Sequence, residues 1–195
     1  MTRVIYNCAA TLDGFIADSE NSLTWLFAVE TDGTDAPSTF MQGMGVLVEG
    51  STTYEWILRE QQLLEHPEQW QTLYGTLPTF VFTTRQLPTP AGADVRFISG
   101  SVADALPQLR EVAGSKNIWV VGGGDLAGQF LDADALDEVQ VALAPVTLGA
   151  GAPLLPRRAE SNQLRLISVE KRGQFANVTY AVSRSTASRS AGEMP

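Results

Sequence analysis

Cysteine and histidine are almost absent from this chain of 195 residues, which holds one of each, Cys8 and His66. A single cysteine excludes a disulfide within the chain, and one Cys with one His cannot form a zinc site of the Cys/His type. A Ser-His-Asp triad would have to use His66, which lies in a polar segment before Pro67, so we do not expect one. We therefore expect no metal centre, and we interpret Cys8, within an apolar run, as a core residue.

Basic residues are also scarce, since 13 Lys and Arg stand against 22 Asp and Glu and give a net charge of −9. Residues 1–100 hold twelve acidic and four basic residues, whereas residues 101–195 hold ten and nine. Such an acidic chain is poorly suited to bind nucleic acid or an anionic membrane surface. An anionic ligand would have to be held locally by backbone N–H groups, hydroxyls and a few arginines.

Long hydrophobic runs are missing as well. No window approaches 18 apolar residues, and the N-terminus lacks the basic start and apolar stretch of a signal peptide. We expect a soluble, cytoplasmic protein. Its 44% hydrophobic residues are enough for a sizeable core. We expect one domain over residues 1–184 and a disordered, Ser- and Ala-rich tail over residues 185–195.

Helices are predicted to alternate with strands until the last third of the chain. Apolar runs predict strands at 4–10, 46–48, 80–84, 95–98 and 118–121. Helices are expected at 23–29, from Ser51 or Thr52 by the capping-box spacing to Glu55, after the cap Ser101, and after Gly124. The end of the chain reads as strands alone, at 139–143 in an antiparallel pattern and in a hairpin of 164–170 with 175–183. This order predicts an α/β fold with three layers, in which helices cover both faces of a mixed, mostly parallel sheet with an antiparallel C-terminal edge.

Two segments lead an apolar strand through glycine directly into a helix start, at 48–53 and at 121–126. Glycine allows a ligand to approach the backbone, and the free N–H groups and dipole of the first helical turn favour a phosphate oxygen. The hydroxyls of Ser51, Thr52 and Thr53 add donors at the first segment. Two such sites in one sheet suit a dinucleotide. A tight turn without a ligand is the alternative, and it is more plausible for Gly50 than for three successive glycines.

The second segment also fits the loose dinucleotide fingerprint G-x-G-x-x-G/A, but we exclude a Rossmann fold. That fold needs an acidic residue about 20 positions later, and position 142 is Ala. Fewer than 80 residues follow the motif, too few for the rest of a doubly wound domain.

A third segment, Thr83, Thr84 and Arg85, closes a predicted strand with two hydroxyls and a guanidinium. Such a group can hold a phosphate through a bidentate pair and hydroxyl donors. The 2′-phosphate of NADP would require this arrangement. A solvated turn arginine is the alternative interpretation.

Five motifs in this order, at 10–17, 50–55, 81–85, 120–124 and 145–154, resemble the reductase domain of bacterial riboflavin biosynthesis, a group with the dihydrofolate-reductase-like fold. The resemblance covers residues 3–183. It implies an NADPH-dependent reductase of the 5-amino-6-(5-phosphoribosylamino)uracil reductase type and a homodimer. The H-x-E and C-x-x-C elements of the fused zinc deaminase are absent, so the chain resembles a stand-alone member.

The resemblance also implies the cofactor contacts. Residues 50–53 and 122–127 would flank the pyrophosphate, residues 83–85 would hold the 2′-phosphate, and the loop 13–17 would lie over the nicotinamide. The expected cofactor-binding residues are Ala10, Ile16, Ala17, Gly50, Ser51, Thr52, Thr53, Thr83, Thr84, Arg85, Gly122, Gly123, Gly124, Asp125, Leu126 and Ala127.

Two carboxylates are our candidates for catalysis. Asp13 is expected to relay a proton or to hydrogen-bond the substrate, and its alternative role is to cap the turn at Gly14. Glu49 ends an apolar run beside the expected anion site, where it would repel the cofactor unless it is protonated or turned toward the substrate. Ser51 stands where members of the group often carry Arg or Lys, so one phosphate-facing cation is missing.

The resulting hypothesis is hydride transfer from NADPH to a C=N or C=O carbon of a small heterocyclic (pyrimidine- or pterin-like) or sugar-derived substrate. Two alternatives remain open. One is a non-catalytic nucleotide-binding protein on the same fold, and the other is a flavin- or deazaflavin-dependent reductase that uses the same cleft.

Overall fold

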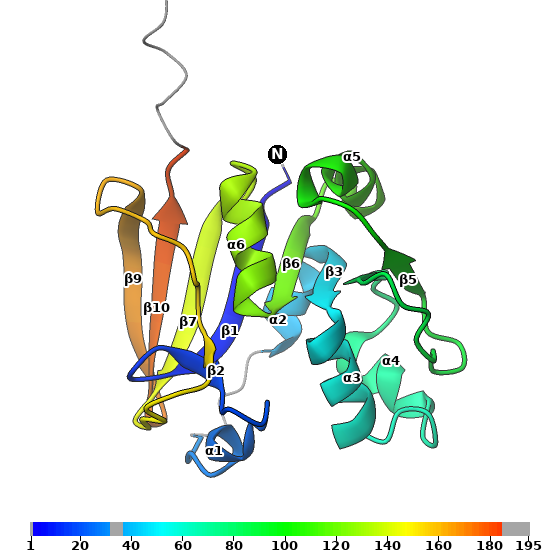
Figure 1. Ribbon diagram of the computed structural model, residues 1–195, viewed down its shortest axis with the longest axis horizontal. Helices are drawn as coiled ribbons and strands as arrows, with labels where there is room; N and C mark the ends of the chain where they lie inside the picture. Colours follow the sequence, from blue (N-terminus) through cyan, green and yellow to red (C-terminus); the bar gives the residue numbers. More distant parts are fainter. Residues whose placement is uncertain (1, 32–36, 185–195) are drawn as a thin grey trace, which may run out of the picture.

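One eight-stranded sheet forms the centre of the computed structural model, which describes residues 2–31 and 37–184. The expected tail, 185–195, lies outside the described residues. The strand order is β5-β4-β3-β6-β1-β7-β10-β9 (Figure 1). The bounds are β1 Val4–Thr11, β3 Met44–Gly50, β4 Thr79–Phe82, β5 Val95–Ile98, β6 Asn117–Gly122, β7 Glu138–Ala144, β9 Leu164–Arg172 and β10 Phe175–Val182.

The sheet is parallel from β5 to β7 and becomes antiparallel where β10 joins β7. The predicted hairpin at the end of the chain is confirmed as β9 and β10. The alternating apolar pattern at 139–143 predicted an antiparallel strand, which is correct on one side only: β7 pairs antiparallel with β10 but parallel with β1. Alternation along a strand reports which face is buried, not the direction of the neighbouring strand.

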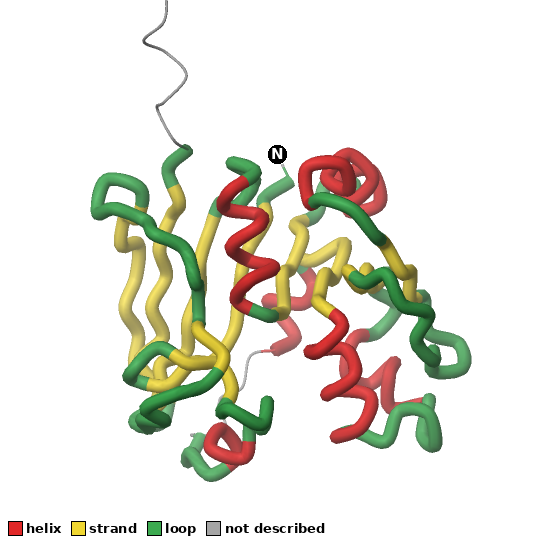
Figure 2. Tube along the Cα trace, viewed as in Figure 1, coloured by secondary structure: helices red, strands yellow, loops and turns green. Residues whose placement is uncertain are grey.

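Helices cover both faces of the sheet, as predicted. Helices α5 (Val102–Ala113) and α6 (Gly124–Asp132) lie on the face turned toward the viewer (Figures 1 and 2). Helices α3 (Ser51–Glu60) and α4 (Glu68–Tyr74) pack on the other face over β3 and β4. Strand β3 divides its side chains accordingly, since Val46 and Val48 join the larger core cluster while Glu49 faces the α3 side.

Helix starts were predicted with mixed success. The side chain of Ser101 caps α5 by accepting the backbone N–H of Asp104, as expected. The predicted start of α3 at Ser51 is confirmed, but the capping box was wrong, because the N-cap is Gly50 and no described side chain caps this helix. Ser51 is already the first helical residue, and Glu55 pairs with Arg85 instead of reaching back to the helix start.

Four short elements were not predicted. They are α2 (Pro37–Gln42), α4, and the strands β2 (Phe15–Ala17) and β8 (Ala152–Pro153), which pair with each other; α1 (Thr24–Phe27) is shorter than the predicted 23–29. Elements this short carry too few residues for a hydrophobic period to stand out. None of the helices in the described ranges has the length and apolar character needed to cross a bilayer.

Candidate functional site

The two glycine segments meet at one end of the sheet. Strands β3 and β6 are neighbours, and Glu49 pairs with Gly122. A Cβ atom on Gly50 would lie 3.9 Å from the carbonyl oxygen of Gly122 and 3.9 Å from the backbone nitrogen of Gly123. Because both strands end here, α3 and α6 begin side by side at the carboxyl edge of the parallel sheet.

Neither helix start is capped by a side chain. Gly50 is the N-cap of α3 and Gly123 is the N-cap of α6, both in extended backbone conformations that other residues also adopt. A Cβ at either glycine would meet no atom closer than 3.8 Å. At Gly50 the backbone angles and the space at the Cβ position would therefore admit a larger residue, whereas Gly123 also follows a cis peptide bond from Gly122. Glycine at both positions leaves the first-turn N–H groups open to approach by a ligand.

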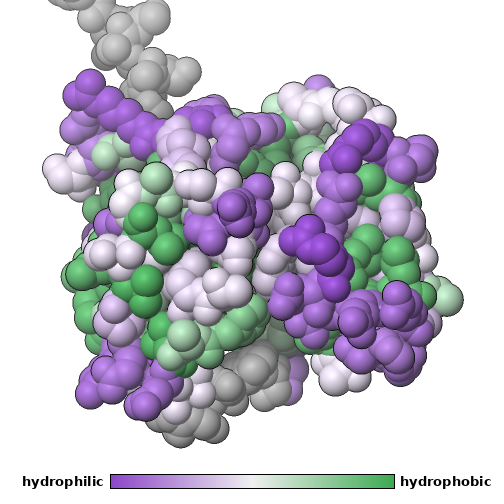
Figure 3. Space-filling view, turned by 60° about the horizontal axis from the view of Figure 1, so that its bottom comes forward, coloured by the Kyte–Doolittle hydropathy of each residue, from purple (hydrophilic) through white to green (hydrophobic). Residues whose placement is uncertain are grey.

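A cavity of about 850 Å³ lies in front of these helix starts. Figure 3 brings this end of the molecule forward and shows weakly polar and apolar residues over much of its middle, with hydrophilic side chains gathered on the right, toward α3 and α4. Most of the predicted cofactor-binding residues line the cavity: Ile16, Ala17, Gly50, Ser51, Thr52, Thr53, Gly122, Gly123, Gly124, Asp125 and Leu126.

Five predicted cofactor residues do not line this cavity. Ala10 and Ala127 are fully buried in the main core. Thr83, Thr84 and Arg85 follow β4 at the same edge of the sheet. The cavity wall includes Phe82, the last residue of β4, but not these three residues. The Arg85 guanidinium is held by both carboxylate oxygens of Glu55. A phosphate at Arg85 would have to compete with this ion pair, and the role in 2′-phosphate binding stays a prediction.

The cavity wall carries little charge. Asp125 is the only charged side chain among the described lining residues. Its carboxylate accepts hydrogen bonds from Gln129 and from Arg157, at 2.9 and 3.0 Å, and these bonds lower its pKa. No Lys or Arg of the described chain lines the cavity, so an anion would depend on backbone N–H groups and on the hydroxyls of residues 51–53.

A strap formed by β2 and β8 crosses the front of the cavity, and Asp13 anchors it. The Asp13 carboxylate accepts the backbone N–H groups of Leu148 and Gly149 at 3.0 and 2.7 Å and the Thr11 hydroxyl at 2.6 Å. These bonds lower its pKa, the Thr11 hydroxyl contributing most. Asp13 does not line the cavity. Asp13 therefore holds the distant loop of residues 148–149, which neither of its two predicted roles included.

Gly124 has a structural role that Gly50 and Gly123 lack. A Cβ on Gly124 would lie 2.2 Å from the carbonyl oxygen of Pro153 and 2.4 Å from that of Leu154, both in the backbone of the strap. We expect Gly124→Ala to lower the free energy of unfolding by about 1–3 kcal/mol, the usual cost of overpacking. Urea unfolding measures this, with Gly50→Ser as the control, which adds a Cβ without a close contact and should keep or slightly raise the stability. Equal stability of the two variants would contradict the close contact.

Glu49, the second catalytic candidate, precedes Gly50 but, like Asp13, does not line the cavity. Its side chain is fully buried, and neither carboxylate oxygen has a hydrogen-bond partner among the residues that the structure describes. Burial raises its pKa to about 8, so the carboxyl is largely protonated at neutral pH. The Glu49 charge acts on Tyr54 and Tyr74, whose pKa values are raised mainly by burial and also by this charge. Tyr74 also lines the cavity.

Several cavity residues were missed in the sequence. Asn7 on β1, Trp119 on β6 and Tyr74 on α4 line the cavity. Cys8 also lines it, while packing against the main core as a partly buried residue. Burial raises the pKa of the Cys8 thiol to about 12, which disfavours a nucleophilic role. A polar Asn7 within an otherwise apolar strand was the one available signal.

The strand order, the crossover helices and the glycine-ended strands define an α/β protein with the dihydrofolate-reductase-like fold. The chain belongs to the RibD C-terminal domain family, whose model matches residues 62–176. Two relatives from Bacillus subtilis (strain 168) are similar along most of their length. The uncharacterized protein YwjB is 31% identical over 91% of this chain and 97% of its own, and the uncharacterized protein YyaP is 25% identical over 85% and 87%.

Solved structures agree with this assignment. A putative riboflavin biosynthesis protein from Shewanella sp. PV-4 superposes with a TM-score of 0.75 at 25% identity, over 94% of this chain and 100% of that chain. A pyrimidine reductase-like protein from Corynebacterium diphtheriae gives 0.62 at 15% identity, over 94% and 93%. A diaminohydroxyphosphoribosylaminopyrimidine deaminase/5-amino-6-(5-phosphoribosylamino)uracil reductase from Thermotoga maritima gives 0.63 at 18% identity, where this chain covers 57% of that chain. Family and fold together indicate a reductase-like role.

Proposed function

We propose that this protein is an NADPH-dependent reductase that transfers a hydride to a C=N or C=O carbon of a small heterocyclic or sugar-derived substrate. One observation carries the proposal: two helix N-termini without side-chain caps open side by side into one cavity of about 850 Å³. A pyrophosphate offers two adjacent anionic groups, and two adjacent N-termini match that spacing of charge.

The residues present fit this cofactor. Gly50 and Gly123 leave space that a Cβ would fill, directly at the N–H groups of the first turns. The hydroxyls of Ser51, Thr52 and Thr53 supply further donors, and Ile16 and Ala17 of the strap would cover the nicotinamide. Bound NADPH would supply the hydride. The protein would orient the substrate and supply a proton.

Glu49 is our proposed proton source. Its carboxyl is fully buried and does not line the cavity, so it can act as a proton source only through an intervening group such as Tyr74, which does line the cavity. Hydride transfer to the carbon of a C=N bond leaves a nitrogen that must take up a proton. A buried carboxyl with a pKa of about 8 holds that proton at neutral pH. Its protonated form also removes the repulsion that a carboxylate next to Gly50 would exert on an anionic cofactor.

A flavin-dependent reductase is the second candidate. The observation in its favour is the lack of Lys or Arg among the described cavity-lining residues, because a flavin carries fewer phosphates than NADPH. We also propose the homodimer expected from the family resemblance. The exposed apolar side chains of Leu166, Ile167 and Val169 on β9 support it, because a second copy could bury them.

The test is a titration with NADPH, NADH and flavins, followed through the fluorescence of the four tryptophans, of which Trp56 and Trp119 line the cavity. We expect saturable binding of NADPH that Gly123→Asp abolishes, because the new carboxylate occupies the phosphate site. A lack of response to NADPH at millimolar concentration, together with a response to a flavin, would support the second candidate. Normal NADPH binding by Gly123→Asp would refute the pyrophosphate assignment.

A further inference from the structure

A second cavity, of about 700 Å³, adjoins the first one over the open face of β1, β7 and β10. The two cavities share Asn7, Ala9, Leu26, Trp119 and Ala142. A ligand in the second cavity would therefore meet a ligand in the first one along these residues. A reductase needs this arrangement, with the cofactor in one compartment and the substrate beside it in the other.

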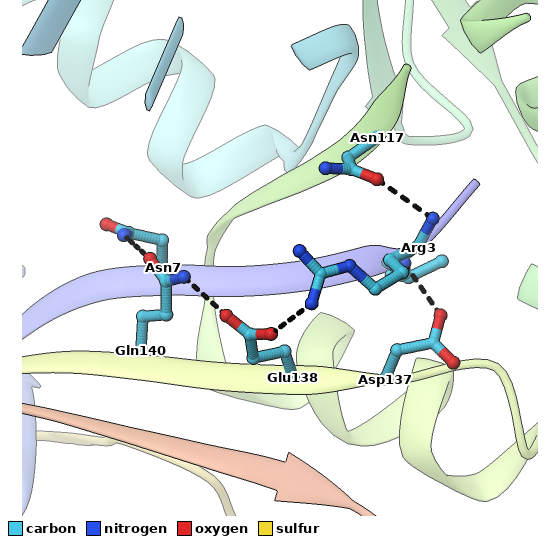
Figure 4. A network of polar contacts seen from close by, with 7 residues as sticks. Arg3, Asn7, Asn117, Asp137, Glu138 and Gln140 are labelled. Carbon is cyan, nitrogen blue, oxygen red and sulfur yellow. Dashed lines mark hydrogen bonds and ion pairs between the residues drawn. The ribbon is translucent and has the colours of Figure 1, made fainter. Parts of the chain in front are cut away.

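Asn7 stands at this junction at the end of a chain of hydrogen bonds (Figure 4). Arg3 donates to Glu138 at 2.6 Å, and the Gln140 amide nitrogen donates to the other oxygen of the same carboxylate at 2.5 Å. The Asn7 amide nitrogen then donates to the Gln140 oxygen at 2.6 Å. The Glu138 side chain is only 8% exposed, so its charge holds the chain of bonds firmly.

The order of donors fixes the orientation of each amide. An ionised carboxylate only accepts, so Gln140 must turn its nitrogen toward Glu138 and its oxygen toward Asn7. Asn7 must then present its nitrogen to Gln140. Figure 4 shows the Asn7 side-chain oxygen on the opposite side of its amide, pointing away from the network. No donor from the described part of the chain reaches this oxygen, which leaves a fixed acceptor at the junction of the cavities.

The surroundings of this acceptor suit a flat, uncharged ring. Trp119 lines both cavities, and Phe40 meets it edge to face at a centroid distance of 5.2 Å. The Trp119 N–H donates to the main-chain oxygen of Asn7, which holds the indole in place. The charged groups of the second cavity, Glu170 and Arg172, neutralise each other in an ion pair at 3.0 Å.

We infer that the second cavity receives the substrate and that Asn7 determines its specificity, by accepting a hydrogen bond from a ring N–H of a flat, uncharged heterocycle such as a cyclic amide. Gln140 is a positioning residue that keeps the acceptor turned outward. The inference rests on the proposed reductase function, because it names the partner that the cofactor would reduce.

The test uses 2-pyridone and its N-methyl derivative, two flat rings that differ in the one N–H group. Their binding to the full chain is measured by ligand-detected NMR titration up to 20 mM, in parallel with NADPH binding. We expect 2-pyridone to bind at least 10-fold more tightly than the methylated ring, because methylation leaves the Asn7 oxygen unpaired. Asn7→Leu should remove this difference, and Gln140→Leu should reduce it.

Asn177→Leu is the matched control, because Asn177 is the same residue type in the same cavity but lies on β10 outside the hydrogen-bond chain. It should keep the full preference for 2-pyridone. Circular dichroism and thermal unfolding check that each variant is folded. The inference fails if the wild type binds both rings equally or neither, or if Asn177→Leu, rather than Asn7→Leu, removes the preference. NADPH binding in the same samples tests the proposed function separately, because a wild type that binds NADPH but neither ring refutes only this inference.

Discussion

Gly50→Asp should stabilise the folded protein and at the same time weaken NADPH binding at least 100-fold. Gly50 is the uncapped N-cap of α3, in a backbone conformation that aspartate adopts, and its Cβ position is free of close contacts. An Asp side chain there accepts first-turn N–H groups and interacts favourably with the helix dipole, which we expect to add up to about 1 kcal/mol of stability. The same N–H groups are then lost to the phosphate, and the carboxylate repels it.

Gly50→Asn separates the two causes, since asparagine caps a helix equally well without a charge. We expect it to stabilise the protein similarly and to weaken NADPH binding by a smaller factor. Thermal unfolding without ligand and tryptophan fluorescence titration measure the two effects. If Gly50→Asp is stabilised yet binds NADPH like the wild type, the N-terminus of α3 does not hold the phosphates.

Glu49→Met should make the protein markedly more stable at pH 8 and more stable by a smaller amount at pH 4.5, where only the cost of a buried polar group without a partner remains. In the unfolded chain the Glu49 carboxyl ionises near pH 4.5, whereas in the folded protein burial delays ionisation to about pH 8. Below pH 4.5 both states hold the proton, so Glu49 imposes no ionisation cost. Between pH 4.5 and 8 unfolding releases the proton, and stability falls by about 1.4 kcal/mol for each pH unit. Above pH 8 the cost is constant, at roughly 3–5 kcal/mol.

Urea unfolding at pH 5, 6.5 and 8 measures this effect as the difference in the free energy of unfolding between wild type and variant. The difference cancels the contribution of the other carboxyl groups to the pH dependence. Glu49→Gln is the matched control. It abolishes the ionisation but keeps a polar group without a partner, so it should lose the pH dependence and remain less stable than Glu49→Met. Tyr54 and Tyr74, which face Glu49, stay neutral throughout this range because their pKa values are raised. A constant difference from pH 5 to 8 would show that Glu49 is ionised in the folded protein.

Much of the fold followed from local patterns in the sequence. Continuous apolar runs such as 118–121 marked the buried parallel strands, and the cap at Ser101 marked the start of α5. Short elements such as α4 and β8 escaped because their residues show no period of their own and are held by tertiary contacts. The capping-box prediction failed since glycine, not serine, occupies the N-cap of α3.

The candidate site was likewise predicted only in part from the sequence. The two glycine segments, and their likeness to one another, were visible in the sequence. The sequence did not distinguish Gly124, which the strap backbone requires, from Gly50 and Gly123, which have free space in front of them. It also did not reveal that Arg85 pairs with Glu55, thirty residues away, or that the Asp13 carboxylate holds the backbone of residues 148–149.

The sequence by itself determined the class of the protein, the succession of its main strands along the chain and the two glycine segments that begin helices. These features are recognised from motifs and patterns of residues that are close together in the chain. Only the tertiary structure decided that both segments open into one cavity, that Glu49 is buried without a hydrogen-bond partner in the described part of the chain, and that Asn7 presents a fixed acceptor. The physical reason is that burial, pKa and the direction of a hydrogen bond depend on atoms that the chain brings together from distant positions: Asn7 is oriented by a chain of bonds that runs through Gln140 and Glu138, more than 130 residues further along.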